Sequence, residues 1–289
     1  MTDSSRSTTY SDLHWTNEDG LQIVARNWQV ESPIGTVLLI HGIGDHSGRF
    51  EHVANFLNQA GYSVLTPDLR GHGRSEGPRG YLRDFDMLND DIEIALQKSR
   101  LNCPDGPAFL YGHSMGALTV INFVLKTMPP IAGVIATSPP LRIAMPAPAW
   151  QLAIGRVLGK VLPKFALSSG LDINELSDDP QVASRTETDR YQHDRVTPAA
   201  YFGMVETGEW CLKNASSLKC PMLLMHGKAD RITDHTASME FSLASSQCVL
   251  RLWDEGKHEL HNMSYHLDVL AEITRFQNRC IHADSPNTD

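Results

Sequence analysis

The chain has no excess of positive charge. Its 289 residues include 34 acidic side chains against 25 lysines and arginines, which gives a formal net charge of −9. Proteins that bind nucleic acid neutralise phosphates with clusters of basic residues. The sequence therefore argues against DNA or RNA as a partner. The chain also has no apolar run that approaches the roughly 20 residues of a bilayer-spanning helix, so no such span is predicted.

Cysteine is scarce and unpatterned. The five cysteines are widely spaced and include no C-x-x-C pair. Metal and redox motifs need cysteines close together in sequence. We therefore expect reduced thiols in a cytoplasmic protein, with neither a metal nor an organic cofactor. The polar residues 1–9 lack the apolar centre of a secretion signal, and residues 283–289 are expected to form a polar tail. The sequence leaves the oligomeric state open.

Apolar runs and helical patterns alternate along most of the chain. A repeated strand–helix pattern is typical of a mostly parallel sheet with helices on both faces. The sequence predicts this α/β fold for a core of residues 1–138 and 201–282. Strands are expected at 10–15, 21–30, 36–40, 62–68, 107–111, 131–137, 221–227 and 248–253. Helices are expected to include 84–100, 234–245 and 265–281.

Residues 139–200 interrupt the alternation and contain no convincing core strand. Open α/β sheets hold their active sites at the carboxyl ends of the strands, so this insertion is predicted to form a mainly helical cap there. Its first half carries an apolar helical stripe with basic residues on another face. The stripe runs from Trp150 through Ile154, Val157, Leu158, Val161 and Leu162; the basic residues are Arg156, Lys160 and Lys164. Such a helix either dips into a lipid surface as a lid or packs on the core, and the sequence leaves both open.

A serine lies on a sharp turn between a strand and a helix. Gly112-His113-Ser114-Met115-Gly116 has the form G-x-S-x-G, which at such a turn is the nucleophile elbow of hydrolases. The turn is so tight that side chains at 112 and 116 would collide with the neighbouring backbone. Ser114 is therefore the candidate nucleophile, at a helix N-terminus that favours negative charge.

A serine nucleophile needs a base, and the base needs a group that orients it. In this architecture the order along the chain is serine, carboxylate, histidine, each at a strand end. Asp230 and His258 come directly after the last two predicted strands, which makes them the candidates. Asp234 and His261 are the alternatives. Both lie farther from the strand ends, and Asp234 is better suited to capping the next helix.

Stabilising the negative charge of an acyl-transfer intermediate requires two backbone N–H groups. One is expected from Met115, directly after the serine. The other is expected from the glycine-containing loop after the early strand at 36–40, with Ile43 as the donor.

With these residues in place, the chain resembles the monoacylglycerol-lipase-like branch of the α/β-hydrolases, whose members are often described as lysophospholipases. The matching stretches are H-G-I-G-D-H-S-G-R-F (41–50), T-P-D-L-R-G-H-G-R-S (66–75), G-H-S-M-G (112–116), G-K-A-D-R (227–231) and H-E-L-H (258–261). The resemblance implies the α/β-hydrolase fold and an esterase for single-chain acyl lipids. It also supports Asp230 and His258 over their alternatives.

The resemblance further implies which residues hold the polar alcohol end of the substrate. These are Asp45, Arg49, His113, Tyr191 and His261. The expected partner is a small lipid-like ester, with possible peripheral membrane contact through the cap.

These residues together predict a serine hydrolase that acts through an acyl-enzyme. A lysophospholipase, a thioesterase or a short-chain carboxylesterase would use the same triad, so the sequence leaves the substrate open. A non-catalytic ligand-binding protein with a hydrolase shell is the alternative from another class. The intact triad and oxyanion loop argue against it.

Overall fold

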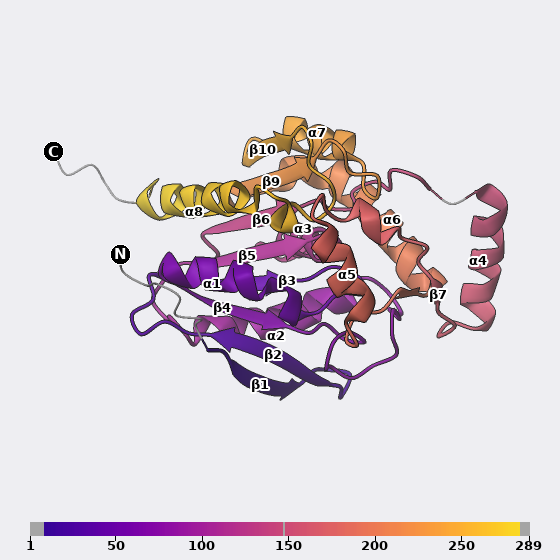
Figure 1. The fold of residues 1–289 in the computed structure, drawn as a ribbon, viewed down its shortest axis with the longest axis horizontal. Coiled ribbons are helices and arrows are strands. Elements are labelled where there is room, and N and C mark those ends of the chain that lie inside the picture. The colour runs from indigo at the N-terminus through magenta and orange to yellow at the C-terminus, as the bar shows by residue number, and fades with distance from the viewer. Residues whose placement is uncertain (1–8, 147, 284–289) are drawn as a thin grey trace.

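An eight-stranded sheet runs through the centre of the computed structural model, which describes residues 9–146 and 148–283 (Figure 1). Only β2 runs against the other strands, because β1–β2 and β2–β4 are antiparallel and every other pair is parallel. In spatial order the strands are β1 (Ser11–Thr16), β2 (Gln22–Trp28), β4 (Tyr62–Pro67), β3 (Gly35–Ile40), β5 (Ala108–His113), β6 (Gly133–Thr137), β9 (Met222–Gly227) and β10 (Cys248–Trp253).

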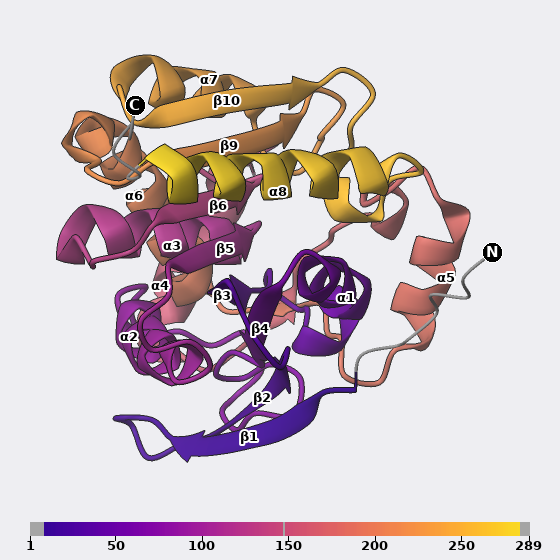
Figure 2. The same cartoon turned by 90° about the vertical axis from the view of Figure 1, so that its left-hand side faces the viewer.

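Helices cover both faces of this sheet (Figure 2). One face carries α1 (Glu51–Gln59) and α8 (His266–Ala283). The other carries α2 (Met87–Arg100), α3 (Met115–Thr127), α6 (Pro198–Asn214) and α7 (His235–Ala244). Each face has its own apolar cluster between the sheet and its helices. The predicted α/β-hydrolase architecture is confirmed.

The burial of the central strands explains why the sequence predicted them. Every residue of β3, β4, β5, β6 and β9 is buried. Strands covered on both faces read as nearly continuous apolar runs, and these five strands are mostly apolar. The edge strand β10 has no fully buried residue.

Two helices differ from the sequence expectation. Helix α2 begins at Met87 instead of residue 84, and in the turn before it the Asp84 carboxylate accepts a hydrogen bond from the Met87 N–H at 3.1 Å. Helix α6 was not expected. It begins at Pro198 behind the cap residue Thr197, whose hydroxyl accepts from the N–H of Ala200.

The segment predicted as a cap adds no strand to the central sheet. It contains α4 (Ala149–Val161), β7 (Leu167–Ser168), the 3₁₀ turn η2 (Ile173–Glu175), α5 (Pro180–Thr188), β8 (Arg195–Val196) and the start of α6. The strands β7 and β8 pair only with each other. Helix α4 stands at one end of the molecule, away from the sheet (Figure 1). The predicted polar tail, apart from Ala283, lies outside the described residues, as do residues 1–8.

No helix in the described ranges combines the length and the apolar character that a membrane crossing requires.

Candidate active site

Ser114 occupies a strained turn between β5 and α3. Its φ is 53° and its ψ is −124°, a conformation that costs free energy in a residue other than glycine and is concentrated at functional sites. A Cβ on Gly112 would lie 2.3 Å from the Gly116 carbonyl oxygen, and one on Gly116 would lie 2.2 Å from that of Ile40. The collisions expected from the sequence are therefore present, and the two glycines allow the strand and helix to approach this closely.

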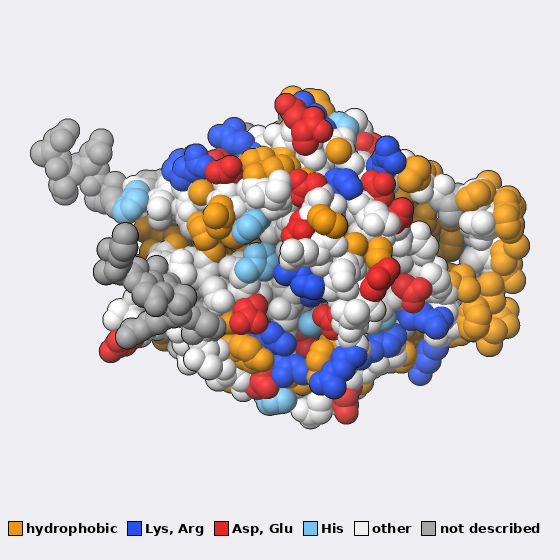
Figure 3. Space-filling view, viewed as in Figure 1, with side chains coloured by type: hydrophobic (Ala, Val, Ile, Leu, Met, Phe, Trp, Pro, Cys, Tyr) orange, Lys and Arg blue, Asp and Glu red, His pale blue; other side chains and the backbone are white. Residues whose placement is uncertain are grey.

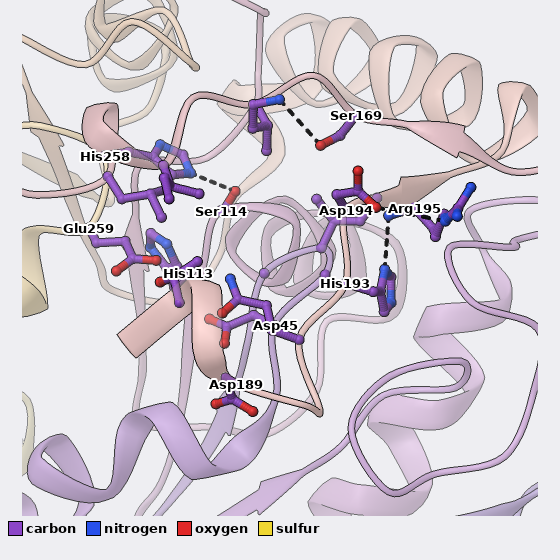
Figure 4. A pocket seen from close by; sticks show the side chains of 18 of the residues that line it. Asp45, His113, Ser114, Ser169, Asp189, His193, Asp194, Arg195, His258 and Glu259 are labelled. Atoms are coloured by element: carbon purple, nitrogen blue, oxygen red, sulfur yellow. Dashed lines mark hydrogen bonds and ion pairs between the residues drawn. The ribbon is translucent and has the colours of Figure 1, made fainter. Parts of the chain in front are cut away.

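A chain of hydrogen bonds joins Ser114 to two residues from distant loops. His258, in the loop after β10, has its Nε2 at 2.9 Å from the Ser114 Oγ. Its Nδ1 lies 2.8 Å from an oxygen of Asp230, in the turn after β9. All three side chains are buried, and the close-up shows His258 beside the serine hydroxyl (Figure 4). The structure thus brings together the three predicted residues.

The carboxylate of Asp230 is held by several donors besides His258. One oxygen accepts from the N–H groups of Ile232 and Thr233 at 2.8 and 3.0 Å, and the other accepts from the Thr233 hydroxyl at 2.7 Å. Burial alone would raise the pKa of Asp230, but the neighbouring His258 and His226 hold that pKa well below its usual range. Asp230 is therefore a fixed anion next to the base.

Burial also disfavours the charged form of His258, but the Asp230 carboxylate outweighs it and raises the pKa of the imidazole above 6.5. A histidine in this state is readily able to accept a proton from a neighbouring hydroxyl.

Sequence reasoning missed His226, the second histidine at Asp230. It lies at the end of β9, fully buried, with Nε2 3.3 Å from the Asp230 Oδ2 and Nδ1 2.7 Å from the Ser238 hydroxyl. The only sequence signal was a histidine just before the turn that carries Asp230.

Asp234 and His261, the alternatives to Asp230 and His258, make contacts outside the hydrogen-bonded chain. The Asp234 carboxylate accepts from the Thr236 N–H at 2.8 Å and caps α7, as expected. His261 is fully buried and stacks on Phe50 with 4.7 Å between ring centroids. Neither ring nitrogen of His261 has a hydrogen-bond partner among the described residues.

The expected oxyanion donors lie beside the serine. Met115 is the first residue of α3, so its N–H has no acceptor within the helix. Ile43 lines the cavities that meet at Ser114. The loop comes close to the serine at Gly42, where a Cβ would lie 3.1 Å from the Ser114 Cβ.

Two cavities meet at Ser114. The first, here called the polar cavity, has a volume of about 330 Å³ and includes Asp45, His113, Asp189, Asp194, His258 and Glu259 in its wall, beside the apolar side chains of Ile43, Leu171, Ile173 and Leu176. The second, here called the apolar cavity, has a volume of about 310 Å³. Its wall includes Ile143, Met145, Leu171, Met204 and Ile232. A substrate attacked by Ser114 could therefore extend in two directions of different polarity.

The five residues expected to hold the alcohol are divided by the structure. Asp45 and His113 line the polar cavity, whereas Arg49, Tyr191 and His261 are absent from its wall. Tyr191 packs against His46, with ring centroids 5.6 Å apart.

Arg49 lies behind the wall of the polar cavity and ties its parts together. Its Nε lies 3.0 Å from Asp45, and its Nη2 donates to both oxygens of Glu259 at 2.8 Å. Its Nη1 donates to the hydroxyl of Thr186 in α5 at 2.6 Å. The guanidinium therefore connects the oxyanion loop, the predicted cap and the loop of His258.

Burial and Arg49 act oppositely on the two carboxyl groups. Burial raises the pKa of Asp45 to about 6 despite the attraction of Arg49. In Glu259 burial is outweighed by Arg49, and the pKa is lowered. Sequence reasoning missed Glu259, whose only signal was its position next to His258. Among the described residues, no group of three or more His, Cys, Asp and Glu side chains could hold a metal ion.

The sheet, the elbow serine and its hydrogen-bonded histidine and aspartate define the protein as an α/β-hydrolase of the serine type. The model of the family described as serine aminopeptidase, S33, matches residues 31–263. The chain belongs to this family.

Known relatives agree with this assignment. Human monoglyceride lipase is 33% identical over 89% of this chain and 86% of that protein. The crystal structure of Paleococcus ferrophilus monoacylglycerol lipase superposes with a TM-score of 0.81 at 30% identity, covering 89% of this chain and 99% of that one. An abhydrolase domain-containing protein of Dictyostelium discoideum is 33% identical over 82% of this chain, which spans only 26% of that relative. The resemblance stated from the sequence motifs is confirmed, as is a hydrolase enzyme.

Proposed function

We propose that this protein is a serine esterase that cleaves esters of single-chain acyl lipids, such as monoacylglycerols. The hydrogen-bonded chain from Ser114 through His258 to Asp230, at the junction of two cavities, carries the proposal. The names of the human and Paleococcus relatives support this substrate class.

In the proposed reaction the Ser114 hydroxyl attacks the ester carbonyl while His258 takes its proton. The acyl–serine bond forms, the ester C–O bond breaks, and His258 passes the proton to the leaving alcohol oxygen. Water then attacks the acyl-serine by the same route and releases the fatty acid. Asp230 orients the imidazole and stabilises its charge. The N–H groups of Ile43 and Met115 stabilise the oxyanion, and removing one such donor typically costs about 3–4 kcal/mol.

The position of His258 assigns the two halves of the substrate to the two cavities. The group that protonates the leaving oxygen must be within hydrogen-bond reach of it. His258 lines the polar cavity and is absent from the wall of the apolar one. The alcohol half therefore belongs in the polar cavity and the acyl chain in the apolar cavity.

The surface of α4 supports a second part of the proposal, that residues 139–200 form a cap touching lipid surfaces. No residue of α4 is buried, and most of its stripe is open to solvent, with Trp150, Val157 and Val161 63%, 63% and 70% exposed. Apolar side chains cover this end of the molecule (Figure 3). An exposed apolar face beside Arg156 and Lys160 suits an interfacial helix better than one that only packs on the core.

Labelling with a fluorophosphonate tests the catalytic proposal. We expect labelling and monoacylglycerol hydrolysis by the wild type, loss of both in Ser114→Ala, and retention of both in the control Ser184→Ala on α5. A wild type that takes no label and cleaves no ester would instead be a binding protein. Faster cleavage of thioesters or amides than of esters with the same acyl chain would indicate another acyl-transfer reaction.

Sedimentation with liposomes of phosphatidylcholine and phosphatidylglycerol tests the cap. The double variant Val157→Ser/Val161→Ser should bind at least about threefold more weakly, because two exposed apolar side chains are lost. The control Leu243→Ser changes an 87% exposed leucine on α7 and should bind like the wild type. Equal binding by all three proteins would contradict the lipid contact.

A further inference from the structure

The polar cavity is rich in negative charge. Its wall contains one guanidinium, that of Arg195, and no lysine among the described residues. Five carboxylates belong to the same wall: Asp45, Glu187, Asp189, Asp194 and Glu259. In the close-up, Asp45, Asp194 and Glu259 lie around Ser114, whereas the Arg195 side chain extends away from it (Figure 4).

Among the buried groups of this wall, negative charge exceeds positive charge. Asp45 and Glu259 are 5% and 4% exposed, and both bind the single guanidinium of Arg49. The lowered pKa of Glu259 keeps it ionised at neutral pH, and Asp45, with a pKa of about 6, is mostly ionised at pH 7 and above. Two carboxylates against one guanidinium leave a negative charge next to His258. A buried charge without full compensation is costly, so a cation in the cavity would be favoured.

The outer part of the cavity wall adds further negative charge. Asp194 lies 3.7 Å from Arg195, so these two charges largely cancel. Asp189 is bound to His46 at 2.8 Å, and its lowered pKa keeps it ionised. Glu187 lines the cavity at an exposed position, and its side chain makes no ion pair with any residue that the structure describes, so its negative charge is balanced by solvent alone.

His113 supplies an independent sign that a hydrogen-bond donor belongs in this cavity. Its side chain is 2% exposed, and its Nδ1 lies 3.2 Å from the Thr137 hydroxyl. That hydroxyl donates to the Gly112 carbonyl at 3.3 Å, so it accepts from the Nδ1–H. Burial holds the pKa of His113 well below its ordinary value, so the ring is neutral and its Nε2 is an acceptor. Within the described residues this nitrogen has no partner, although the side chain lines the cavity.

We infer that the polar cavity selects esters whose alcohol half carries a protonated amine, and disfavours esters of anionic alcohols. The inference rests on the proposed function, because it requires the leaving alcohol to occupy the cavity that His258 lines. An ammonium N–H would supply both the positive charge that the carboxylates lack and the donor that His113 lacks. Walls of one charge sign in a cleft focus the field on a bound group.

Three hexanoyl esters of similar shape test the inference. Their alcohols are 2-(dimethylamino)ethanol, which is protonated at pH 7, its neutral isostere 3-methylbutanol, and anionic 3-hydroxypropionate. Each kcat/KM is divided by the rate of hydroxide hydrolysis of the same ester, which removes differences in intrinsic reactivity. At low ionic strength we expect the cationic ester to exceed the neutral one about tenfold, and the anionic ester to be the slowest. About 0.5 M salt should narrow these ratios.

A matched pair of variants assigns the effect to the cavity wall. Glu187→Gln should lower the cationic-to-neutral ratio about two- to threefold, because it removes one uncompensated charge. Glu93→Gln makes the same change at an exposed position of α2 and should leave the ratio unchanged.

The outcomes separate this inference from the function on which it rests. Equal normalised rates for the cationic and neutral esters, faster cleavage of the anionic ester, or equal effects of the two variants would overturn the charge preference and leave the esterase standing. Failure to cleave any of the three esters above the level of Ser114→Ala would remove the proposed function and this inference with it.

Discussion

The helix that follows Ser114, α3, and the first helix of the proposed cap, α4, differ in how deeply they are buried. In α3 every residue from Met115 to Leu125 is buried, whereas α4 has no buried residue. Both helices are short and mostly apolar, so composition does not separate them. The reacting groups are fixed by contacts on every side, whereas the helix proposed to touch lipid surfaces makes few contacts with the rest of the protein. Substitutions should therefore affect chemistry in the first region and access or binding in the second.

The largest contrast in kcat is expected between variants of two aspartates that follow β9. Asp230→Asn should lower kcat about 10⁴-fold, because the asparagine cannot stabilise the imidazolium or select the same tautomer. Asp234→Asn changes a helix cap of similar size and should lower kcat no more than about twofold. Steady-state ester hydrolysis measures both. A similar loss in the two variants would mean that Asp230 has no special role.

The next largest contrast concerns the free energy of unfolding and compares one glycine in α3 with one in α4. Gly116→Ala places a Cβ 2.2 Å from the Ile40 carbonyl oxygen and should lower the free energy of unfolding by about 3 kcal/mol or more. In Gly155→Ala the new Cβ comes no nearer than 3.6 Å to Phe202. That change should be neutral or stabilise by up to about 1 kcal/mol, because alanine favours the helix. Urea unfolding measures both, and equal stability of the two variants would contradict the packing described.

A smaller effect on kcat is expected from His226, whose Nε2 lies 3.3 Å from Oδ2 of Asp230, the same oxygen that His258 contacts. His226→Leu removes a polar partner of the Asp230 carboxylate and should lower kcat about tenfold, a loss of roughly 1.4 kcal/mol. His226→Gln retains a donor and should recover most of that loss. The pH dependence of kcat/KM should also shift in the leucine variant. A shift in stability with unchanged kcat and pH profile would show that His226 is merely structural.

The smallest effect concerns the pH profile of the wild type. His258 acts as a base only when neutral, and its pKa is raised above 6.5 by Asp230 despite burial. Raising the pKa moves the acidic side of the profile to higher pH. As pH increases, kcat/KM should therefore rise with a midpoint above pH 6.5. Below that midpoint His258 is protonated and activity should be lost. A midpoint clearly below 6.5, with a substrate that does not titrate there, would contradict this electrostatic description.

The sequence was informative where structure is local. Continuous apolar runs identified the buried strands, and the collisions predicted for Gly112 and Gly116 were found because a turn specifies its own geometry. The strand ends also located Asp230 and His258, since parallel strands place their carboxyl ends at one edge of the sheet.

Long-range side-chain pairing could not be predicted in this way. Arg49 and Glu259 meet only because two loops and α5 pack together, and nothing near either residue indicates the other. The burial of His261 against Phe50 has the same origin. The start of α6 and the exposure of the α4 stripe also depend on how residues 139–200 pack against the rest of the chain, which the helical pattern alone does not contain.

The central claim is that Ser114 and His258 work as a single catalytic unit. The direct test compares kcat for ester hydrolysis in Ser114→Ala, His258→Ala and the double variant. Residues that act as one unit lose nearly everything with the first substitution. We predict that all three variants fall by a similar factor, about 10⁶, with the double variant within threefold or so of either single one. A double variant far slower than both single variants, or a Ser114→Ala enzyme with substantial activity, would contradict the account.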